Sequence, residues 1–196
     1  MRTFIGIDLP TEWARALSQA CNVFRGDRGE WARCRWVPAE NLHITLNFLG
    51  ELESGEVDAL TEELTSVCEK RMPIYLPLVD PVVPVRSMAR ATMMWTVFGD
   101  PQGTCADLVA AIATVAAGYG VAPETRPYVP HVTLVRTRRP SCVDERLRAD
   151  ASSAIRSALR EANPSVSVRE ITVYSSTLTR AGATYQRRAR VMLGSR

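Results

Sequence analysis

His43-Ile44-Thr45-Leu46 and His131-Val132-Thr133-Leu134 carry most of the structural information in the chain, because both of its histidines stand in the same four-residue frame. Alternation of polar and apolar residues over such a stretch is typical of a half-buried β-strand. Side chains two residues apart on a strand share one face of the sheet. Each motif therefore predicts an imidazole and a hydroxyl side by side, with its aliphatic residues turned toward the core.

Helical and extended patterns recur around each motif, and the two histidines lie 88 residues apart. Such a repeat indicates an internal duplication that gives a mixed α+β fold with two lobes. The expected elements are a strand at 4–9, a helix from 11 to the glycines at 26–29, a strand at 43–49, a helix from 54 that ends before the proline at 73, two or three extended segments within 74–98 broken at Pro77, Pro81 and Pro84, a helix around 108–115, a strand at 131–136, a helix at 144–162, and strands at 166–178 and 184–193 joined around 181–183.

The chain has 196 residues, of which 46% are hydrophobic and 23% charged, with a net charge of +3. These values are typical of a globular protein and argue against disordered, collagen-like and coiled-coil chains. The five cysteines are widely spaced and contain no C-x-x-C pair, so neither a disulfide framework nor a zinc site is expected. The apolar run at 4–7 is too short for a signal peptide, and no segment reaches transmembrane length. We therefore expect a cytoplasmic protein that does not associate with a membrane.

Positive charge is concentrated in the second half of the chain. Residues 1–98 hold 10 basic and 13 acidic side chains, whereas residues 99–196 hold 14 basic and 8 acidic ones. The second half is therefore the one expected to face an anion. All of the basic residues except Lys70 are arginine, which suits bidentate contacts with phosphate. A genome rich in G and C produces the same bias, and this compositional explanation carries more weight.

Two histidines in matching motifs suit the hydrolysis of a phosphodiester. The attacking water must lose a proton and the leaving alkoxide must gain one, and histidine is the side chain that titrates nearest neutral pH. The threonine hydroxyls can donate hydrogen bonds to the nonbridging phosphoryl oxygens, where charge accumulates. If a two-fold axis relates the lobes, both imidazoles and both hydroxyls surround one small anion in a cleft.

Three other interpretations of the histidines are weaker. An isolated histidine is usually a structural residue, but the repeated frame favours a functional role. Two histidines without neighbouring cysteines or carboxylates leave a zinc site short of ligands. A Ser-His-Asp triad is not indicated, because the chain has no G-x-S-x-G motif. We therefore expect neither a metal nor a cofactor.

Further stretches extend the two motifs to the pattern of a known family. They are residues 4–10 for its opening strand, 36–38, 41–46 and 48–50 for its first motif, 130–134 with Arg136 for its second motif, and Tyr174, Ser176, Leu178, Gly182 and Tyr185 for its C-terminal hairpin. Together they resemble the RNA 2′,3′-cyclic phosphodiesterases of the two-histidine phosphoesterase superfamily, also called the 2′-5′ RNA ligase family, over nearly the whole chain. Two positions depart from the family pattern. Asn47 stands where small residues are common, and Tyr128-Val129 where an aromatic residue followed by histidine is more frequent.

The resemblance implies a bilobal, pseudo-two-fold arrangement of two antiparallel sheets, with helices on the outside and a central active-site cleft. Residues 1–196 would form a single domain of this kind. The implied activity is metal-independent hydrolysis of a 2′,3′-cyclic phosphate at the end of an RNA or of a small nucleotide. The implied product is a 2′-phosphomonoester. We expect the protein to be a monomer.

By the same resemblance, His43 and His131 would be the catalytic residues, and the phosphate would be bound by Thr45, Thr133 and Arg136. We expect His43 to be the general acid to the 3′ oxygen and His131 the base for water, although the spacing fits the reverse assignment equally. Two alternatives stay open: a nucleotide-binding module without turnover, and 2′-5′ RNA ligation by the reverse chemistry.

Arg136 and Phe48 each lie five residues after a motif histidine, an odd number that points them to the opposite face of a flat strand. Arg136 can reach the phosphate only if its strand ends or bulges near Val135. Otherwise it is a solvated surface residue. Phe48 is expected first in the core and second as a substrate-binding residue that stacks on a base.

The remaining aromatic and basic residues are less specific. The four tryptophans are expected to pack in the core or between the lobes, with one at the cleft rim able to stack on a base. They are Trp13, Trp31, Trp36 and Trp95. Six arginines usually form a solvated face, but they would guide an RNA end by counterion release if they cluster. They are Arg126, Arg138, Arg139, Arg187, Arg188 and Arg190.

Overall fold

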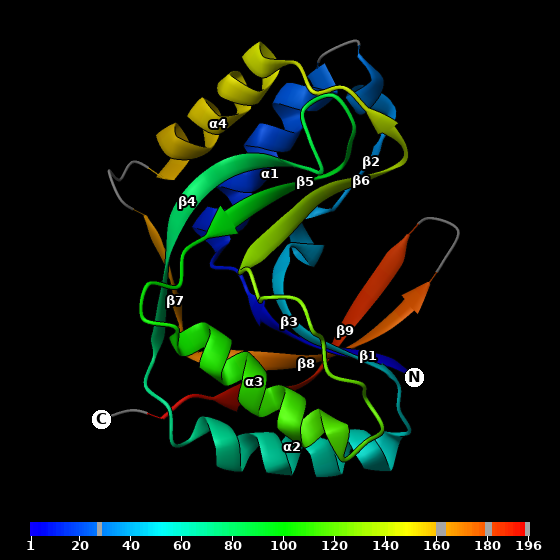
Figure 1. Cartoon of the computed structure of the whole chain (residues 1–196), viewed down its shortest axis with the longest axis vertical. Helices are drawn as coiled ribbons and strands as arrows, with labels where there is room; N and C mark the ends of the chain where they lie inside the picture. Colours follow the sequence, from blue (N-terminus) through cyan, green and yellow to red (C-terminus); the bar gives the residue numbers. More distant parts are fainter. Residues whose placement is uncertain (27–28, 160–163, 179–181, 195–196) are drawn as a thin grey trace.

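The structure is a computed structural model that describes residues 1–26, 29–159, 164–178 and 182–194 (Figure 1). Within these ranges, helices and strands are mixed along the chain, which confirms the predicted α+β class. The elements are, in chain order, β1 (Arg2–Asp8), α1 (Thr11–Gly26), the 3₁₀ turn η1 (Glu30–Arg33), β2 (Arg35–Trp36), the 3₁₀ turn η2 (Ala39–Asn41), β3 (His43–Glu51), α2 (Ser54–Cys68), β4 (Ile74–Val85), β5 (Ala91–Phe98), α3 (Thr104–Ala117), β6 (His131–Ser141), α4 (Glu145–Leu159), β7 (Ser165–Val168), β8 (Glu170–Leu178) and β9 (Ala183–Met192).

The strands of the described chain form one antiparallel sheet in the order β7-β4-β5-β6-β3-β1-β8-β9, with β2 added to β6. The prediction of two separate sheets is therefore wrong. The two motif strands, β3 and β6, are direct neighbours joined through the pair Ile44 and Val132. The backbone pairing at this position connects the two halves edge to edge. The two strands diverge on either side of the pair (Figure 1).

The two halves of the sheet repeat one arrangement around that central pair. Outward from it, one half reads β3-β1-β8-β9 and the other reads β6-β5-β4-β7. Helices α2 and α3 pack against the first half, and α1 and α4 pack together against the second (Figure 1). Along the chain, each motif strand follows a strand and a helix and is itself followed by a helix. This repetition agrees with the duplication predicted from the motifs.

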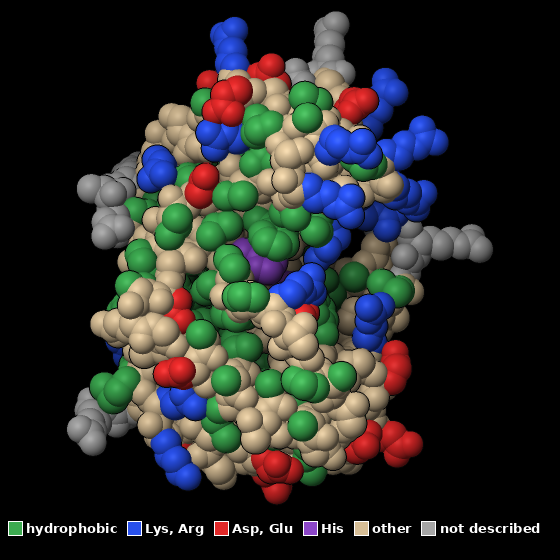
Figure 2. All heavy atoms as spheres, viewed as in Figure 1, with side chains coloured by type: hydrophobic (Ala, Val, Ile, Leu, Met, Phe, Trp, Pro, Cys, Tyr) green, Lys and Arg blue, Asp and Glu red, His purple; other side chains and the backbone are tan. Residues whose placement is uncertain are grey.

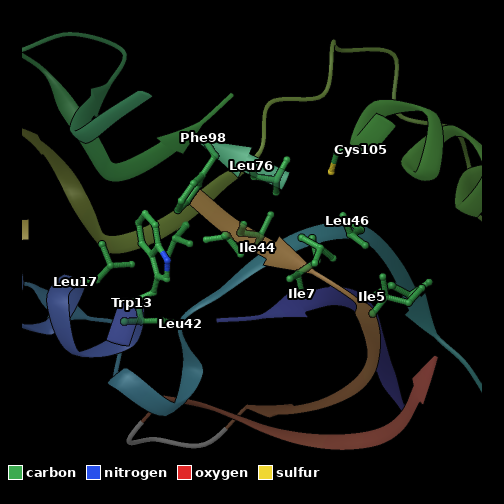
Figure 3. Packing of buried hydrophobic residues seen from close by; sticks show 14 of the residues in the cluster. Ile5, Ile7, Trp13, Leu17, Leu42, Ile44, Leu46, Leu76, Phe98 and Cys105 are labelled. Atoms are coloured by element: carbon green, nitrogen blue, oxygen red, sulfur yellow. The ribbon is translucent and has the colours of Figure 1, made fainter. Parts of the chain in front are cut away.

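The hydrophobic core lies on the face of the sheet that the helices cover (Figure 3). Ile44 and Val132 of the two motifs are fully buried there. Trp13 of α1 packs against Phe98 of β5, with the ring centroids 5.1 Å apart. Because side chains alternate along a strand, this burial leaves the motif histidines and threonines on the opposite, open face.

Strand β4 is more continuous than its prolines predict. It runs unbroken from Ile74 to Val85, so the expected breaks at Pro77, Pro81 and Pro84 are wrong. Proline lacks an N–H and is tolerated in strands at bulges and on edges. The register of β4 against β5 shifts twice around Pro81, so the irregularity is absorbed without ending the strand.

The other expected elements are present, with differences toward the C-terminal side. The strand expected at 166–178 is divided at Arg169 into β7 and β8. Helix α4 is described from Glu145 to Leu159, and the expected end of this helix at 162 lies outside the described residues, as does part of the expected turn at 181–183. No helix in the described ranges is long and apolar enough to cross a membrane.

Candidate active site

The histidines and threonines of β3 and β6 line one pocket between the two halves of the sheet. The antiparallel register of the central pair puts each histidine opposite the threonine of the other motif. Figure 2 shows histidine in a hollow at the centre of this face, with basic side chains beside it. The described residues that line this motif pocket are Val37, Asn41, His43, Thr45, Phe48, His131, Thr133, Arg136 and Tyr185.

Both imidazoles are held by the same backbone contact. Nδ1 of His43 lies 2.7 Å from the carbonyl oxygen of Asn41, and Nδ1 of His131 lies 2.8 Å from that of Val129. A carbonyl oxygen only accepts hydrogen bonds, so Nδ1 carries the proton and donates it. Nε2 of each neutral ring is then the atom that can accept a proton, and in the imidazolium it is the atom that can give one.

The His43 ring lies against aromatic side chains and one glycine. Its Nε2 is 3.1 Å from Oγ1 of Thr45. The ring centroid is 4.9 Å from that of Phe4 and 5.3 Å from that of Tyr185. A Cβ at Gly6 would lie 2.9 Å from a backbone oxygen of β3 and 3.3 Å from Cδ2 of His43. Only glycine therefore allows β1 and the imidazole to approach this closely.

The His131 ring has a different support. It stacks on Trp95 with the centroids 3.8 Å apart and the planes at 25°. Trp95 pairs with Thr133, just as Gly6 pairs with Thr45, so tryptophan replaces glycine at the equivalent position. The face of an indole favours a nearby cation. The other three tryptophans are buried, as predicted.

A β-bulge in each motif strand resets the alternation of side chains. Leu46 is the extra residue of β3 against β1, and Leu134 is the extra residue of β6 against β5. A bulge brings the residues beyond it back to the other face. The bulge required near Val135 is therefore present, and both Phe48 and Arg136 line the pocket beside the histidines.

Phe48 and Arg136 occupy equivalent positions at the pocket mouth. Phe48 is 62% exposed, so the expectation that it belongs to the core is wrong. Its ring centroid lies 6.0 Å from that of Phe4, the residue paired with it on β1. Arg136 is exposed too, and its Nη1 lies 2.8 Å from Sδ of Met93, its partner on β5. An aromatic ring and a guanidinium thus face one pocket from opposite halves.

Asp8 adds a negative charge that the motifs did not predict. It pairs with His43 across β1 and β3, and its carboxylate accepts hydrogen bonds from Nε and Nη2 of Arg187 at 2.9 and 3.0 Å. The hydroxyls of Thr172, at 3.3 Å, and of Tyr174 also donate to it. Burial acts to raise the pKa of Asp8, but these bonds outweigh burial and lower the pKa below its ordinary value of 3.8. In the sequence, Asp8 is distinguished only as a single acidic residue at the end of an apolar strand.

The pKa values of both histidines lie below the ordinary value of 6.5. Burial is the main cause for each ring. The backbone bond of each ring, to Asn41 for His43 and to Val129 for His131, opposes this lowering, and Arg136 adds to the lowering for both rings. The Asp8 carboxylate opposes the lowering for His43 alone, and this is the electrostatic difference between the two rings.

The described residues contain no group of three or more histidine, cysteine, aspartate or glutamate side chains that could hold a metal ion. The cysteines are free thiols, and none of them is among the described residues that line the motif pocket. Burial raises the pKa of Cys21 and of Cys105 to about 12, so both thiols stay protonated and pack as small apolar side chains.

Comparison with known proteins identifies the family. The profile described as "LigT like Phosphoesterase" matches residues 7–80 and 99–185. The chain belongs to the LigT-like phosphoesterase family. The RNA 2′,3′-cyclic phosphodiesterase of Escherichia coli K12 is 29% identical to it over 185 residues, which are 94% of this chain and 92% of that protein. The enzyme of the same name from Aquifex aeolicus is 25% identical over 152 residues, 77% of each protein.

Solved structures of the LigT-like family agree with this membership. The crystal structure of E. coli LigT complexed with 3′-AMP superposes with a TM-score of 0.71 at 27% identity, covering 99% of this chain and 98% of that one. TT0787 of Thermus thermophilus, at 20% identity, shares the fold with a TM-score of 0.73 over the whole of both chains. The resemblance seen in the sequence motifs is therefore confirmed at the level of the family, whose members include homologues named RNA 2′,3′-cyclic phosphodiesterase.

Proposed function

We propose that this LigT-like protein hydrolyses a 2′,3′-cyclic phosphate at the end of an RNA or of a small nucleotide to a 2′-phosphomonoester. The observation that carries the proposal is a single pocket that contains both His-x-Thr pairs and Arg136. In each histidine, Nε2 is the atom able to move a proton. The names of the homologues and the 3′-AMP bound to E. coli LigT support the same class of substrate.

Proton transfer in this reaction is divided between the two imidazoles. Nε2 of neutral His131 takes a proton from water as the new P–O bond forms. The bond from phosphorus to the 3′ oxygen breaks, and the imidazolium of His43 gives its Nε2 proton to that oxygen. Asp8 favours the imidazolium of His43 before the reaction, and Trp95 favours the imidazolium formed on His131 during it. Exchange with solvent restores both protonation states.

The remaining residues of the motif pocket bind the substrate. The hydroxyls of Thr45 and Thr133 donate hydrogen bonds to the nonbridging oxygens, and Arg136 neutralises the charge that develops on them. The exposed ring of Phe48 stacks on the nucleobase of the terminal nucleotide. Because these residues supply both proton transfers and the charge stabilisation, we propose that the reaction needs no metal ion.

The test is incubation of the protein with an RNA oligonucleotide that ends in a 2′,3′-cyclic phosphate, in the presence of EDTA. Mass spectrometry should show the addition of one water, and digestion of the product should locate the phosphate on the 2′ oxygen. A wild-type protein without activity, or full activity in both His43→Ala and His131→Ala, would contradict the proposal. Binding of 3′-AMP without turnover would favour a nucleotide-binding module, and a joined product would favour ligation.

A further inference from the structure

Arginines outside the motif pocket differ in whether a carboxylate neutralises them. Of those expected to guide an RNA end, Arg126 pairs with Glu124 at 2.6 Å, Arg187 with Asp8 at 2.9 Å and Arg190 with Glu170 at 3.7 Å. Arg138 and Arg139 are exposed, and no ion pair within the described ranges includes either of them. Their positive charge is therefore available to an external anion.

The backbone of β6 places these two arginines in a second bulge. Ser141 pairs with Ala91 of β5 and Arg136 pairs with Met93, so residues 137–140 stand against a single residue of β5. The hydroxyl of Thr137 closes this larger bulge. It donates to the carbonyl oxygen of Arg139 at 2.9 Å and accepts from the backbone N–H of the same residue at 3.3 Å. The bulge therefore has a defined shape, and its exposed residues are Arg138, Arg139 and Pro140.

Strand β2 adds a third arginine to the same side of the sheet. Arg35 pairs directly with Arg136, and the next pair, Trp36 with Val135, is buried. The two arginines therefore share the open face, since neighbouring pairs alternate between faces. Arginine side chains therefore follow this side of the sheet from the pocket outward to the bulge.

We propose that an arginine ridge, formed by Arg138 and Arg139, binds the backbone of an RNA strand on the 5′ side of the cyclic phosphate. The inference rests on the proposed function and narrows its substrate class from any cyclic nucleotide to the end of an RNA strand. Figure 2 shows basic side chains gathered between the central histidine and the edge of the molecule. Guanidinium groups make bidentate hydrogen bonds with phosphate, which suits a sugar-phosphate backbone of any sequence.

Distance along β6 separates the ridge from the reacting phosphate. At about 3.3 Å per residue, and allowing for the bulges, Arg138 lies roughly 20 Å from His131 along the strand. The Debye length at physiological ionic strength is about 8 Å, so the charge of Arg138 is largely screened from a phosphate in the pocket. The ridge can therefore act on a substrate only when the substrate extends to it.

The experiment compares two substrates with the same terminal nucleoside, a 2′,3′-cyclic mononucleotide and an RNA hexamer ending in the same cyclic phosphate. The test variant is Arg138→Ala/Arg139→Ala. Its matched control is Arg146→Ala/Arg156→Ala, which removes two exposed arginines from α4 on the outside of the molecule. We expect kcat/KM for the hexamer to fall about tenfold in the test variant, because charged contacts are lost. We expect no change for the mononucleotide, and no change for either substrate in the control.

Salt dependence gives a second measurement. Each phosphate contact with a single strand contributes about −0.7 to the slope of log affinity against log salt concentration. Loss of two contacts should therefore make the slope for the hexamer less negative by about 1.4, while the slope for the mononucleotide stays the same.

An equal fall of kcat/KM for both substrates would show that the arginines act through the pocket or the fold. Unchanged hexamer turnover would show that the ridge binds no RNA. Either result would contradict the proposal that the ridge binds RNA.

Failure of the proposed function is recognisable separately. If the wild-type protein hydrolyses neither substrate, the chemistry is wrong, but the ridge can still be tested by binding. Fluorescence anisotropy of a labelled RNA hexamer with a 3′-terminal phosphate should then show weaker binding to Arg138→Ala/Arg139→Ala than to the control. Equal binding by the test and control variants would also contradict the proposal that the ridge binds RNA.

Discussion

The His43 half and the His131 half share a backbone but differ in what surrounds each imidazole. In both, the histidine begins its strand, Nδ1 donates to a carbonyl two residues earlier, and the fourth residue of the motif forms a bulge. The residue paired across from each histidine is Asp8 in one half and Val97 in the other. The support beneath each ring is Gly6 in one half and Trp95 in the other.

The duplicated backbone and the diverged side chains therefore have different tasks. The backbone gives both rings one tautomer and one pocket, and so makes either histidine able to move a proton. The neighbours then separate the two rings, because the Asp8 carboxylate favours the imidazolium of His43 alone. In the proposed mechanism, this difference makes one histidine the acid and the other the base.

Removal of either imidazole should have the greatest consequence for activity. His43→Ala and His131→Ala should each lower kcat roughly 10²- to 10⁴-fold, because each removes one proton transfer. The double variant should fall little further, since residues that act as a unit are not additive. Initial rates on a 2′,3′-cyclic mononucleotide measure these effects. Full activity in one of the single variants would mean that the two halves do not share the chemistry.

A modified substrate separates the acid from the base. Sulfur in place of the bridging 3′ oxygen leaves as a thiolate, which does not need to be protonated. With this substrate, His43→Ala should recover much of its lost rate relative to wild type, and His131→Ala should recover none. Equal recovery in both variants would contradict the assignment of His43 as the acid.

The next effect distinguishes the two residues at the pocket mouth. Arg136→Ala should lower kcat/KM roughly 10²-fold, because the guanidinium stabilises charge that develops in the reaction. Phe48→Ala should raise KM about fivefold with little change in kcat, because a stacked base contributes about 1 kcal/mol of binding free energy. Arg136→Lys keeps the charge without the planar fork and should lie between wild type and Arg136→Ala. An equal fall of kcat in the alanine variants would mean that both residues have one role.

A smaller effect concerns pH. The alkaline limit of kcat/KM reports the group that must be protonated in the free enzyme, which is His43 in the proposed mechanism. Asp8→Asn removes the carboxylate that favours its imidazolium, so the pKa of His43 should fall further. The alkaline limb should then move to lower pH, with activity above neutral pH reduced severalfold, while the acid limb stays in place. Asp80→Asn, which removes a carboxylate beside Arg148 away from the pocket, is the control. Movement of the acid limb alone would reverse the roles of the histidines.

How much of this could be predicted from the sequence depends on the range of the interactions. The shared face of His43 and Thr45 follows from alternation within three residues. The same alternation in the second motif predicts a shared face for His131 and Thr133. The bulges at Leu46 and Leu134 could not be predicted, because no local pattern marks the residue that lacks a partner. Without the bulge, alternation predicts Phe48 in the core, which is wrong.

Contacts between distant parts of the chain account for the other differences. The single sheet depends on pairing β3 with β6, and a motif does not state which strand will be its neighbour. The bonds of Asp8 reach Thr172 and Arg187, more than 160 residues away along the chain. Such long-range polar contacts follow from the assembled sheet and are not visible in either stretch alone.

The weakest of these effects concerns a side-chain hydrogen bond between the two motif segments. The hydroxyl of Tyr128, three residues before His131, donates to the carbonyl oxygen of Thr45 in the other half at 3.1 Å. Tyr128→Phe should lower the free energy of unfolding by about 1 kcal/mol, since a carbonyl loses its donor. Activity should fall only a fewfold, because both motifs keep their own backbone contacts. Denaturant unfolding and initial rates measure the two effects.

The control is Tyr119→Phe, which removes an exposed hydroxyl bonded to Glu63 at 2.8 Å and should lower the free energy of unfolding by less. If the two variants are equally stable and active, the halves are held by the sheet alone, and their alignment does not depend on this hydrogen bond.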